Sequence, residues 1–435
     1  MNFLLRSAWV PLLVCLALAF AYPYTQDRIE FEGGHPYDCN VYHQMAQQLA
    51  DGAPLAAAKP FVYRLGMPYL AGRFFPDDVL HGFEVLGLAF GAALGAFLFA
   101  LLRAYGLSRA MALWLVALFI ANPYSPFRFS PYLPALVDSG ALALLIGSFW
   151  IYKRSGDLDS RSTAVLMLFG CLGALIREIV IVVPLTFLGA HVIGALFMPE
   201  KRLFSKQTLL HATVVGATIL AIIATRFMVG EAQGSYETLA QMKAAFARNR
   251  QFPEIWILCC LTAIGPLVFA LFGSATNGAF WRYLRTHVEV PIYLLGMAIL
   301  SLVAGNHTDR FVFWMLPGCL ILLGQALEGA WLKLESARAR WLFYAPLLAA
   351  QILAYRALVP FPPTDHETLS APGQASLPLF QNYGEGVNLG QITVAFMTRE
   401  NRIPLLIEFG ILALYLTMVW AIFVGANRAT ALRSE

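Results

Sequence analysis

The stretch VLGLAFGAALGAFLFALL, residues 85 to 102, decides the class of fold because it contains no charged residue. A run of this kind suits a helix that crosses the hydrocarbon core of a bilayer, for which about 20 apolar residues are needed. The whole chain has the same character. Of its 435 residues, 59% are hydrophobic and 13% are charged, whereas soluble domains carry about 25% charged residues. The sequence therefore predicts an all-α protein whose helices form a polytopic transmembrane bundle.

Similar apolar runs recur along the chain and predict about 12 spans, with 11 to 13 as bounds. The stretch ALAFA, residues 17 to 21, resembles a signal-peptide cleavage site, and cleavage there would leave eleven spans. We expect a single integral membrane domain over residues 1–435. The runs lie near residues 4–22, 81–102, 110–123, 135–152, 163–176, 179–197, 209–228, 255–272, 288–304, 311–332, 341–358 and 403–424.

Positive charges predict the orientation of the bundle. With the N-terminus in the cytoplasm, more than half of the 30 cations fall in short cytoplasmic loops, as the positive-inside rule requires. Both termini are then cytoplasmic, and the chain is expected in a plasma membrane, with a bacterial inner membrane as the predicted setting. The small net charge of +4 gives no reason to expect nucleic acid as a partner. The cytoplasmic cations are Arg6, Arg103, Arg109, Lys153, Arg154, Arg161, Lys201, Arg202, Lys206, Arg282, Arg285, Lys333, Arg338, Arg340, Arg428 and Arg433.

In this topology the long polar segments face outward, chiefly the loops at 23–80 and 359–402. The first loop contains GGHPYDCNVYHQMAQQLADG, residues 33 to 52. A helix from Asp38 to about Ala50 is predicted there, with an apolar stripe that suits the membrane interface. Asp38, flanked by His35, Tyr37 and Tyr42, is either a helix cap or a carboxylate at the mouth of a cavity. The two roles are compatible.

Three other outward positions carry candidate site residues. Arg64 either snorkels toward headgroups or grips an anion with its planar fork of donors. Arg177 and Glu178 interrupt a long apolar stretch, so they either lie in a solvated turn or are buried and paired, which would make them functional candidates. The polar turn at 306–310 brings His307 and Asp309 next to Arg310. Arg310 is predicted at a helix N-terminus, where the helix itself favours an anion such as phosphate.

Four short segments, taken in order, resemble the membrane-embedded glycosyltransferases of the GT-C superfamily. They are YDCNVYHQMA (37–46), PFVYRLGMPYLA (60–71), IREIVIVVP (176–184) and NHTDRFVFWMLP (306–317). The resemblance implies a polyprenyl-phosphate-linked sugar as donor, an outward-facing active site and Asp38 as the catalytic aspartate. Many members carry two acids in this loop, whereas here Cys39 and Asn40 follow Asp38. The sequence indicates no metal site, and a divalent metal stays an open alternative.

The residues suit this chemistry. Asp38 would act as general base on an acceptor hydroxyl, which implies inversion at the sugar, while Arg310, with Arg64 or Arg177, would contact the donor phosphate. The supporting residues are then Asp309, His307, Glu178, His35, Tyr37 and Tyr42. The acceptor would be a glycan, a lipid or a protein. The alternatives are a lipid-linked glycan flippase or small-molecule transporter, a polymerase or ligase of lipid-linked glycans, and a non-catalytic scaffold.

Overall fold

The computed structural model describes residues 9–26, 28, 30–35, 38–197, 204–229, 238–275, 278–303, 308–355 and 399–431, and within these ranges it contains helices and no strand. The first half of the chain forms α1 (Trp9–Ala21), α2 (Asp38–Ala50), α3 (Gly66–Phe74), α4 (Val79–Ala104), α5 (Arg109–Ala121), α6 (Pro126–Tyr132), α7 (Asp138–Ser155), α8 (Ser160–Ile176), α9 (Val182–Phe197) and α10 (Lys206–Val229). The predicted helical class is confirmed.

The second half forms α11 (Thr238–Gln251), α12 (Pro253–Ile264), α13 (Ala270–Ala275), α14 (Gly278–Thr286), α15 (Glu289–Val303), α16 (Thr308–Phe313), α17 (Leu316–Lys333), α18 (Ala337–Tyr355) and α20 (Arg399–Ala431). Short 3-10 turns connect some of the helices. They are η2 (Tyr22–Thr25), η3 (Phe31–Gly34), η4 (Phe61–Tyr63), η5 (Glu178–Ile181) and η6 (Pro266–Phe269). Most of the predicted outer loop at 359–402 lies outside the described residues, and only its end is seen, where α20 begins.

Among the described helices, five are long and apolar enough to cross a membrane, and a sixth is added if α14 and α15 count as one crossing bent by 82°. Helices of this length and apolarity are typical of integral membrane proteins. The count of twelve crossings stays a prediction. One reason is that apolar runs can hide breaks: the run at 255–272 ends its first helix at Gly265, which has a φ of +85° and is followed by Pro266.

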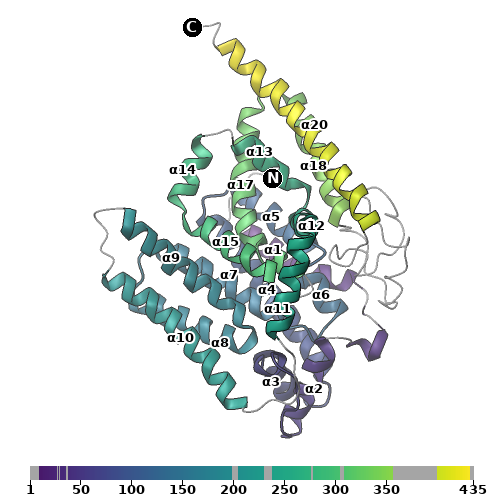
Figure 1. Cartoon of the computed structure of the whole chain (residues 1–435), viewed down its shortest axis with the longest axis vertical. Coiled ribbons are helices and arrows are strands. Elements are labelled where there is room, and N and C mark those ends of the chain that lie inside the picture. The colour runs from purple at the N-terminus through teal and green to yellow at the C-terminus, as the bar shows by residue number, and fades with distance from the viewer. Residues whose placement is uncertain are drawn as a thin grey trace.

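α7 occupies the middle of the bundle (Figure 1) and packs against both α4 and α8. Every residue from Asp138 to Phe149 is buried. A helix that is apolar on all sides belongs in an interior, so the sequence of α7 accounts for its place. Because Asp138 is the first residue of this helix, the chain carries a carboxylate into the protein interior.

The helices α2 and α3 lie together at one end of the bundle (Figure 1). α2 runs from Asp38 to Ala50, as predicted, and buries Tyr42 and Met45. Gly72 of α3 is in such close contact with α2 that a Cβ atom there would collide with the carbonyl oxygen of Ala46. The absence of a side chain at Gly72 therefore fixes how closely the two helices pack.

The other end of α7 carries a second polar group of residues, here called the Lys153 cluster: Tyr105, Lys153, His287 and Glu289. Lys153 Nζ and the Tyr105 hydroxyl both donate to Glu289 Oε1, each at 2.9 Å. His287 Nδ1 lies 2.8 Å from Lys153 Nζ. Lys153 Nζ also lies 4.5 Å from the centre of the Tyr105 ring. The cluster ties α4 and α7 to the bend between α14 and α15.

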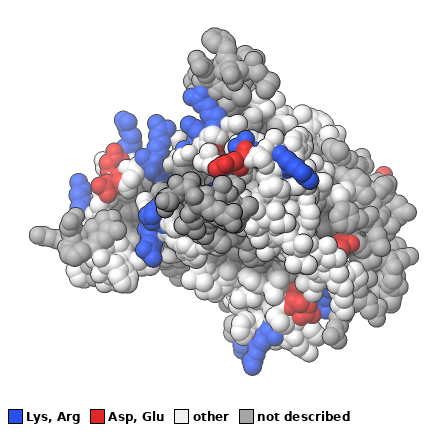
Figure 2. All heavy atoms as spheres, turned by 90° about the horizontal axis from the view of Figure 1, so that it is seen from above, with Lys and Arg blue, Asp and Glu red and all other residues white. Residues whose placement is uncertain are grey.

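Basic side chains gather along one side of the face seen from above in Figure 2. α14 lies in the upper part of the molecule in Figure 1, which Figure 2 views from above. It contributes the exposed Arg282 and Arg285. These two arginines are among those predicted to be cytoplasmic. The orientation itself stays a prediction.

Candidate functional site

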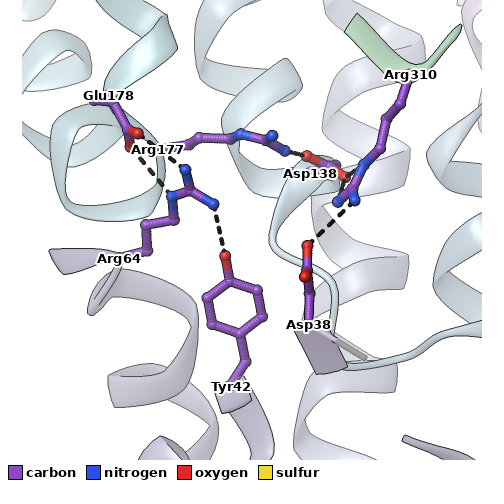
Figure 3. Close-up of polar contacts among 7 residues, drawn as sticks. All are labelled: Asp38, Tyr42, Arg64, Asp138, Arg177, Glu178 and Arg310. Carbon is purple, nitrogen blue, oxygen red and sulfur yellow. Dashed lines mark hydrogen bonds and ion pairs between the residues drawn. The ribbon is translucent and has the colours of Figure 1, made fainter. Parts of the chain in front are cut away.

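A buried carboxylate between two arginines forms the centre of the candidate site (Figure 3). Asp138, which is 7% exposed, receives hydrogen bonds from two arginines outside its own helix, Arg310 and Arg177. Arg310 of α16 donates to Oδ2 through Nε at 2.7 Å and also through Nη2. Arg177 donates to Oδ1 through Nη1. Both oxygens of Asp138 are thus engaged, and the two guanidinium groups are held near each other.

Asp38 lies beside this centre and shares one of its arginines (Figure 3). Arg310 Nη1 is 3.5 Å from Asp38 Oδ2. The Asp38 side chain is 37% exposed, whereas that of Asp138 is 11% exposed. Since α2 begins at Asp38, the carboxylate also lies in the first turn, where the positive end of the helix stabilises it. Of the two acids that contact Arg310, Asp38 is therefore the one that a ligand can reach.

The site has a second group of contacts, centred on Glu178. This group adjoins the contacts around Asp138 because Glu178 directly follows Arg177 in the sequence. The Glu178 carboxylate accepts two hydrogen bonds from Arg64, from Nη2 at 2.9 Å and from Nε at 3.2 Å. Arg64 Nη1 donates to the Tyr42 hydroxyl at 2.9 Å. Such a fork-to-carboxylate pair is directional as well as strong. Burial raises the pKa of the Tyr42 phenol above its ordinary value, so this hydroxyl stays protonated.

The turn between α8 and η5 explains how the adjacent residues Arg177 and Glu178 contact different partners. Arg177 has extended backbone, with φ −164° and ψ 126°. Adjacent side chains on extended backbone point in opposite directions. Arg177 therefore points toward Asp138 and Glu178 toward Arg64, as Figure 3 shows.

Aromatic rings support the Arg177 guanidinium. Arg177 Cζ lies 5.1 Å from the centre of the Trp314 ring and 5.5 Å from the centre of the Phe311 ring. Arg177 is 5% exposed and Arg64 is 9% exposed. The solvated-turn alternative for Arg177 and the snorkelling alternative for Arg64 are therefore both wrong, because each guanidinium is buried and paired.

These seven residues, called the arginine cluster below, are Asp38, Tyr42, Arg64, Asp138, Arg177, Glu178 and Arg310. The three guanidinium groups balance three carboxylates when all are charged. Burying charges is favourable only when each has a partner, and here each of the six has one. Two carboxylates remain partly accessible, since the Glu178 side chain is 43% exposed. The cluster is therefore closed on its Asp138 side and open at Asp38 and Glu178.

The structure brings together six of the residues singled out in the sequence. Of the four others, only the side chain of His35 is described: it stacks on His43, with ring centres 4.1 Å apart, and is not part of the arginine cluster. Tyr37 and His307 lie outside the described residues. The backbone of Asp309 is in α16, but its side chain is outside the described part of the chain.

Asp138 is the member that sequence reasoning missed as a site residue. The topology predicted from the sequence places Asp138 in a short outward-facing turn and gives it no role. A signal was present, because Asp138 begins a helix that is apolar on all faces and follows a proline-rich stretch from Pro123 to Pro134. An acid at such a position is either exposed beyond the helix end or buried with a cation, and Asp138 is buried.

A metal-binding group of three or more His, Cys, Asp or Glu side chains is not found in the part of the chain that the structure describes. Comparison of the chain with models of protein families, with curated proteins and with solved structures gives no match. The composition and fold are those of a helical membrane protein. Its function must be argued from the arginine cluster.

Chemically, the cluster offers two capabilities side by side. Arg310 and Arg177 provide donors for an anion, and their planar forks match phosphate as well as carboxylate. Asp38 provides an accessible carboxylate beside those donors. An anionic ligand that bound Arg310 would therefore have a proton acceptor next to it.

Proposed function

We propose that the protein transfers a sugar from a polyprenyl-phosphate-linked donor to an acceptor hydroxyl on a glycan, a lipid or a protein. The observation that supports this most is Arg310, which lies between a buried acid, Asp138, and an accessible one, Asp38. A phosphate that contacts Arg310 would place its sugar near Asp38. The resemblance of four segments to the GT-C superfamily supports the same reaction.

In the proposed reaction, Asp38 accepts the proton of the acceptor hydroxyl as that oxygen attacks the anomeric carbon. The bond from this carbon to the phosphate oxygen breaks, and polyprenyl phosphate leaves with the bonding electrons. Arg310 stabilises the negative charge that develops on the phosphate, with Arg177 and Arg64 supplying further positive potential. A single displacement inverts the configuration at the sugar. These steps use only side chains of this chain, and a divalent metal stays an open alternative.

Asp138 has a positioning role in this proposal. Its two oxygens hold Arg310 and Arg177 in one orientation, and preorganised donors are more effective than donors that must reorient during reaction. Glu178 does the same for Arg64. The acids of the cluster thus divide into one base, Asp38, and two groups that orient arginines.

The proposal includes a topology in which the chain crosses a bacterial inner membrane twelve times with both termini in the cytoplasm. Asp38, Glu178, Asp309 and residues 360–400 then face the periplasm, while 153–161 and 333–340 face the cytoplasm. Single cysteines introduced at these positions should react with a membrane-impermeant maleimide from the predicted side only. An Asp309→Cys variant labelled from the cytoplasm would overturn both the topology and the reaction proposed for it.

The reaction itself is tested by Asp38→Asn. Asparagine has nearly the same size and is also tolerated at helix starts, but it cannot take the proton. We expect turnover of radiolabelled polyprenyl-phosphate sugars to fall by about 10²–10⁴-fold, the usual contribution of a general base. Donor binding, measured separately by equilibrium dialysis in detergent, should remain.

Asp78→Asn is the matched control. Asp78 is an acid of the same loop whose side chain caps α4 by accepting from the His81 backbone N–H. Its replacement should leave turnover nearly unchanged. If Asp38→Asn behaves like Asp78→Asn, Asp38 has only a structural role at the start of α2.

A further inference from the structure

A cavity separate from the arginine cluster lies between α1, η2, α4 and α6. It has a volume of about 390 Å³. Its walls come from α1, α4 and α6, and both α1 and α6 pack against α4 (Figure 1). None of the seven residues of the arginine cluster lines it. The cavity is thus a second place where this chain could hold a ligand.

The deeper wall of the cavity is apolar and is shaped by two glycines. Gly87 and Gly91 of α4 line it together with Leu88, and Phe127 of α6 faces them. A Cβ atom at Gly91 would lie 3.2 Å from the Phe127 ring, and one at Gly87 would lie 3.1 Å from Ser130 Cβ. Side chains at these two positions would narrow the space. The missing side chains therefore keep an apolar slot open beside a membrane-crossing helix.

The rim of the cavity is polar and carries opposite charges. Arg28 Nη1 lies 3.3 Å from Glu84 Oε1, and the two side chains are 44% and 37% exposed. His81 Nδ1 lies 3.5 Å from the other oxygen of Glu84. Glu84 and Gly91 are seven residues apart on α4, which corresponds to about 10 Å along the helix. The cavity therefore has a charged end at Glu84 and an apolar end near Gly91.

We propose that this cavity binds a zwitterionic phospholipid, with part of one hydrocarbon chain in the slot and the headgroup at Arg28 and Glu84. The volume suits a chain segment and is too small for a whole lipid. The rim favours a zwitterion because the phosphate can contact Arg28 while the ammonium contacts Glu84. A purely anionic headgroup has no ammonium group to pair with the Glu84 carboxylate, so that carboxylate would disfavour it. This inference does not depend on the proposed sugar transfer.

The test uses the full chain in nanodiscs that contain phosphatidylethanolamine with a photoactivatable diazirine in one acyl chain. After irradiation, crosslinked peptides are identified by mass spectrometry. We expect crosslinks in residues 85–91 and 126–131. Leu88→Trp fills the slot and should lower the yield there by about tenfold, as a 1.4 kcal/mol loss of affinity would. Ala89→Trp is the matched control, since Ala89 is exposed on the same helix and outside the cavity.

Val85→Trp repeats the filling test at a lining residue that is 39% exposed, so it stands in if Leu88→Trp does not fold. The headgroup is tested with an otherwise identical phosphatidylglycerol probe. The unaltered protein should prefer phosphatidylethanolamine, and Glu84→Gln should shift the preference toward phosphatidylglycerol by about tenfold. Equal yields for the filled and control variants would overturn the cavity as a lipid site. Preference of the unaltered protein for phosphatidylglycerol, or displacement of the probe by polyprenyl phosphate, would overturn the assignment to a zwitterionic phospholipid.

Discussion

The two ends of α7 each carry a buried charged cluster, and the two clusters differ in what their charges leave accessible. Asp138 at one end and Lys153 at the other are 15 residues apart, which is about 22 Å along a helix. The Lys153 cluster directs its donors to one carboxylate, Glu289, which is 9% exposed. The arginine cluster instead has three guanidinium groups and two partly exposed acids, Asp38 and Glu178.

This difference separates a structural ion pair from a candidate site. In the Lys153 cluster, the charges satisfy one another and tie helices together. In the arginine cluster, Arg310 is shared by two acids, so an arriving anion could replace Asp38 without leaving Arg310 or Asp138 unpaired. Burial of charge alone does not distinguish the two clusters. What distinguishes the arginine cluster is that Arg310 is shared between a buried acid, Asp138, and a partly exposed acid, Asp38.

The largest effect on stability should come from Asp138→Ala. The change leaves Arg177 and Arg310 buried and close together without their common partner. Removal of one member of a buried charged pair costs about 3–5 kcal/mol, and we expect a loss of unfolding free energy in that range, measured by denaturant titration in micelles. Glu84→Ala is the control, because exposed pairs such as Arg28–Glu84 contribute about 1 kcal/mol or less. Equal losses in the two variants would mean that Asp138 is not held as described.

At the other end of α7, Lys153→Met should also destabilise the protein, by about 3 kcal/mol, because Glu289 keeps a buried charge. Adding Glu289→Gln should recover much of that loss, since replacing both partners of a buried pair is often close to neutral. Donor binding should be unchanged in both variants, which sharpens the contrast with the arginine cluster. A drop in donor affinity in the double variant would show that the Lys153 cluster is not purely structural.

A smaller effect, on binding, is expected for Arg310→Ala. Loss of a charge-assisted hydrogen bond to phosphate should weaken donor binding by about 1.5–3 kcal/mol. Dissociation constants from equilibrium dialysis with a polyprenyl-phosphate sugar would measure it. Arg161→Ala, which removes an exposed arginine of α8 outside the cluster, should leave donor affinity unaltered. Unchanged affinity in Arg310→Ala would exclude this residue from the phosphate site.

Local patterns were enough to predict many of the helices. The helix from Asp38 to Ala50 was expected from a polar start and an apolar stripe, and α2 has those bounds. The run at 81–102 corresponds to α4, Val79–Ala104. The count of crossings was harder, because mean apolarity does not register a break such as Gly265-Pro266, where backbone geometry ends a helix inside an apolar run.

The candidate site was predictable as a list of residues and not as a set of pairs. Arg64, Glu178 and Arg310 stood out because charge is rare in this chain. That Arg64 pairs with Glu178, 114 positions away, follows from packing of α3 against α8 and cannot be read from either segment alone. Asp138 shows the same limit. Its place at the start of an apolar helix marks it in the sequence, but only the structure shows that Arg177 and Arg310 are its partners.

The contact between Gly72 and Ala46 has a consequence for how the sequence can vary. Because the α3 backbone lies against the α2 backbone at Gly72, a side chain at this position would push the two helices apart. Asp38 begins one of them and Arg64 precedes the other, so a larger residue at position 72 would shift a carboxylate and a guanidinium at once. In homologous chains, substitutions at position 72 should accordingly be accompanied by changes around position 46, and glycine should persist wherever both charged residues do.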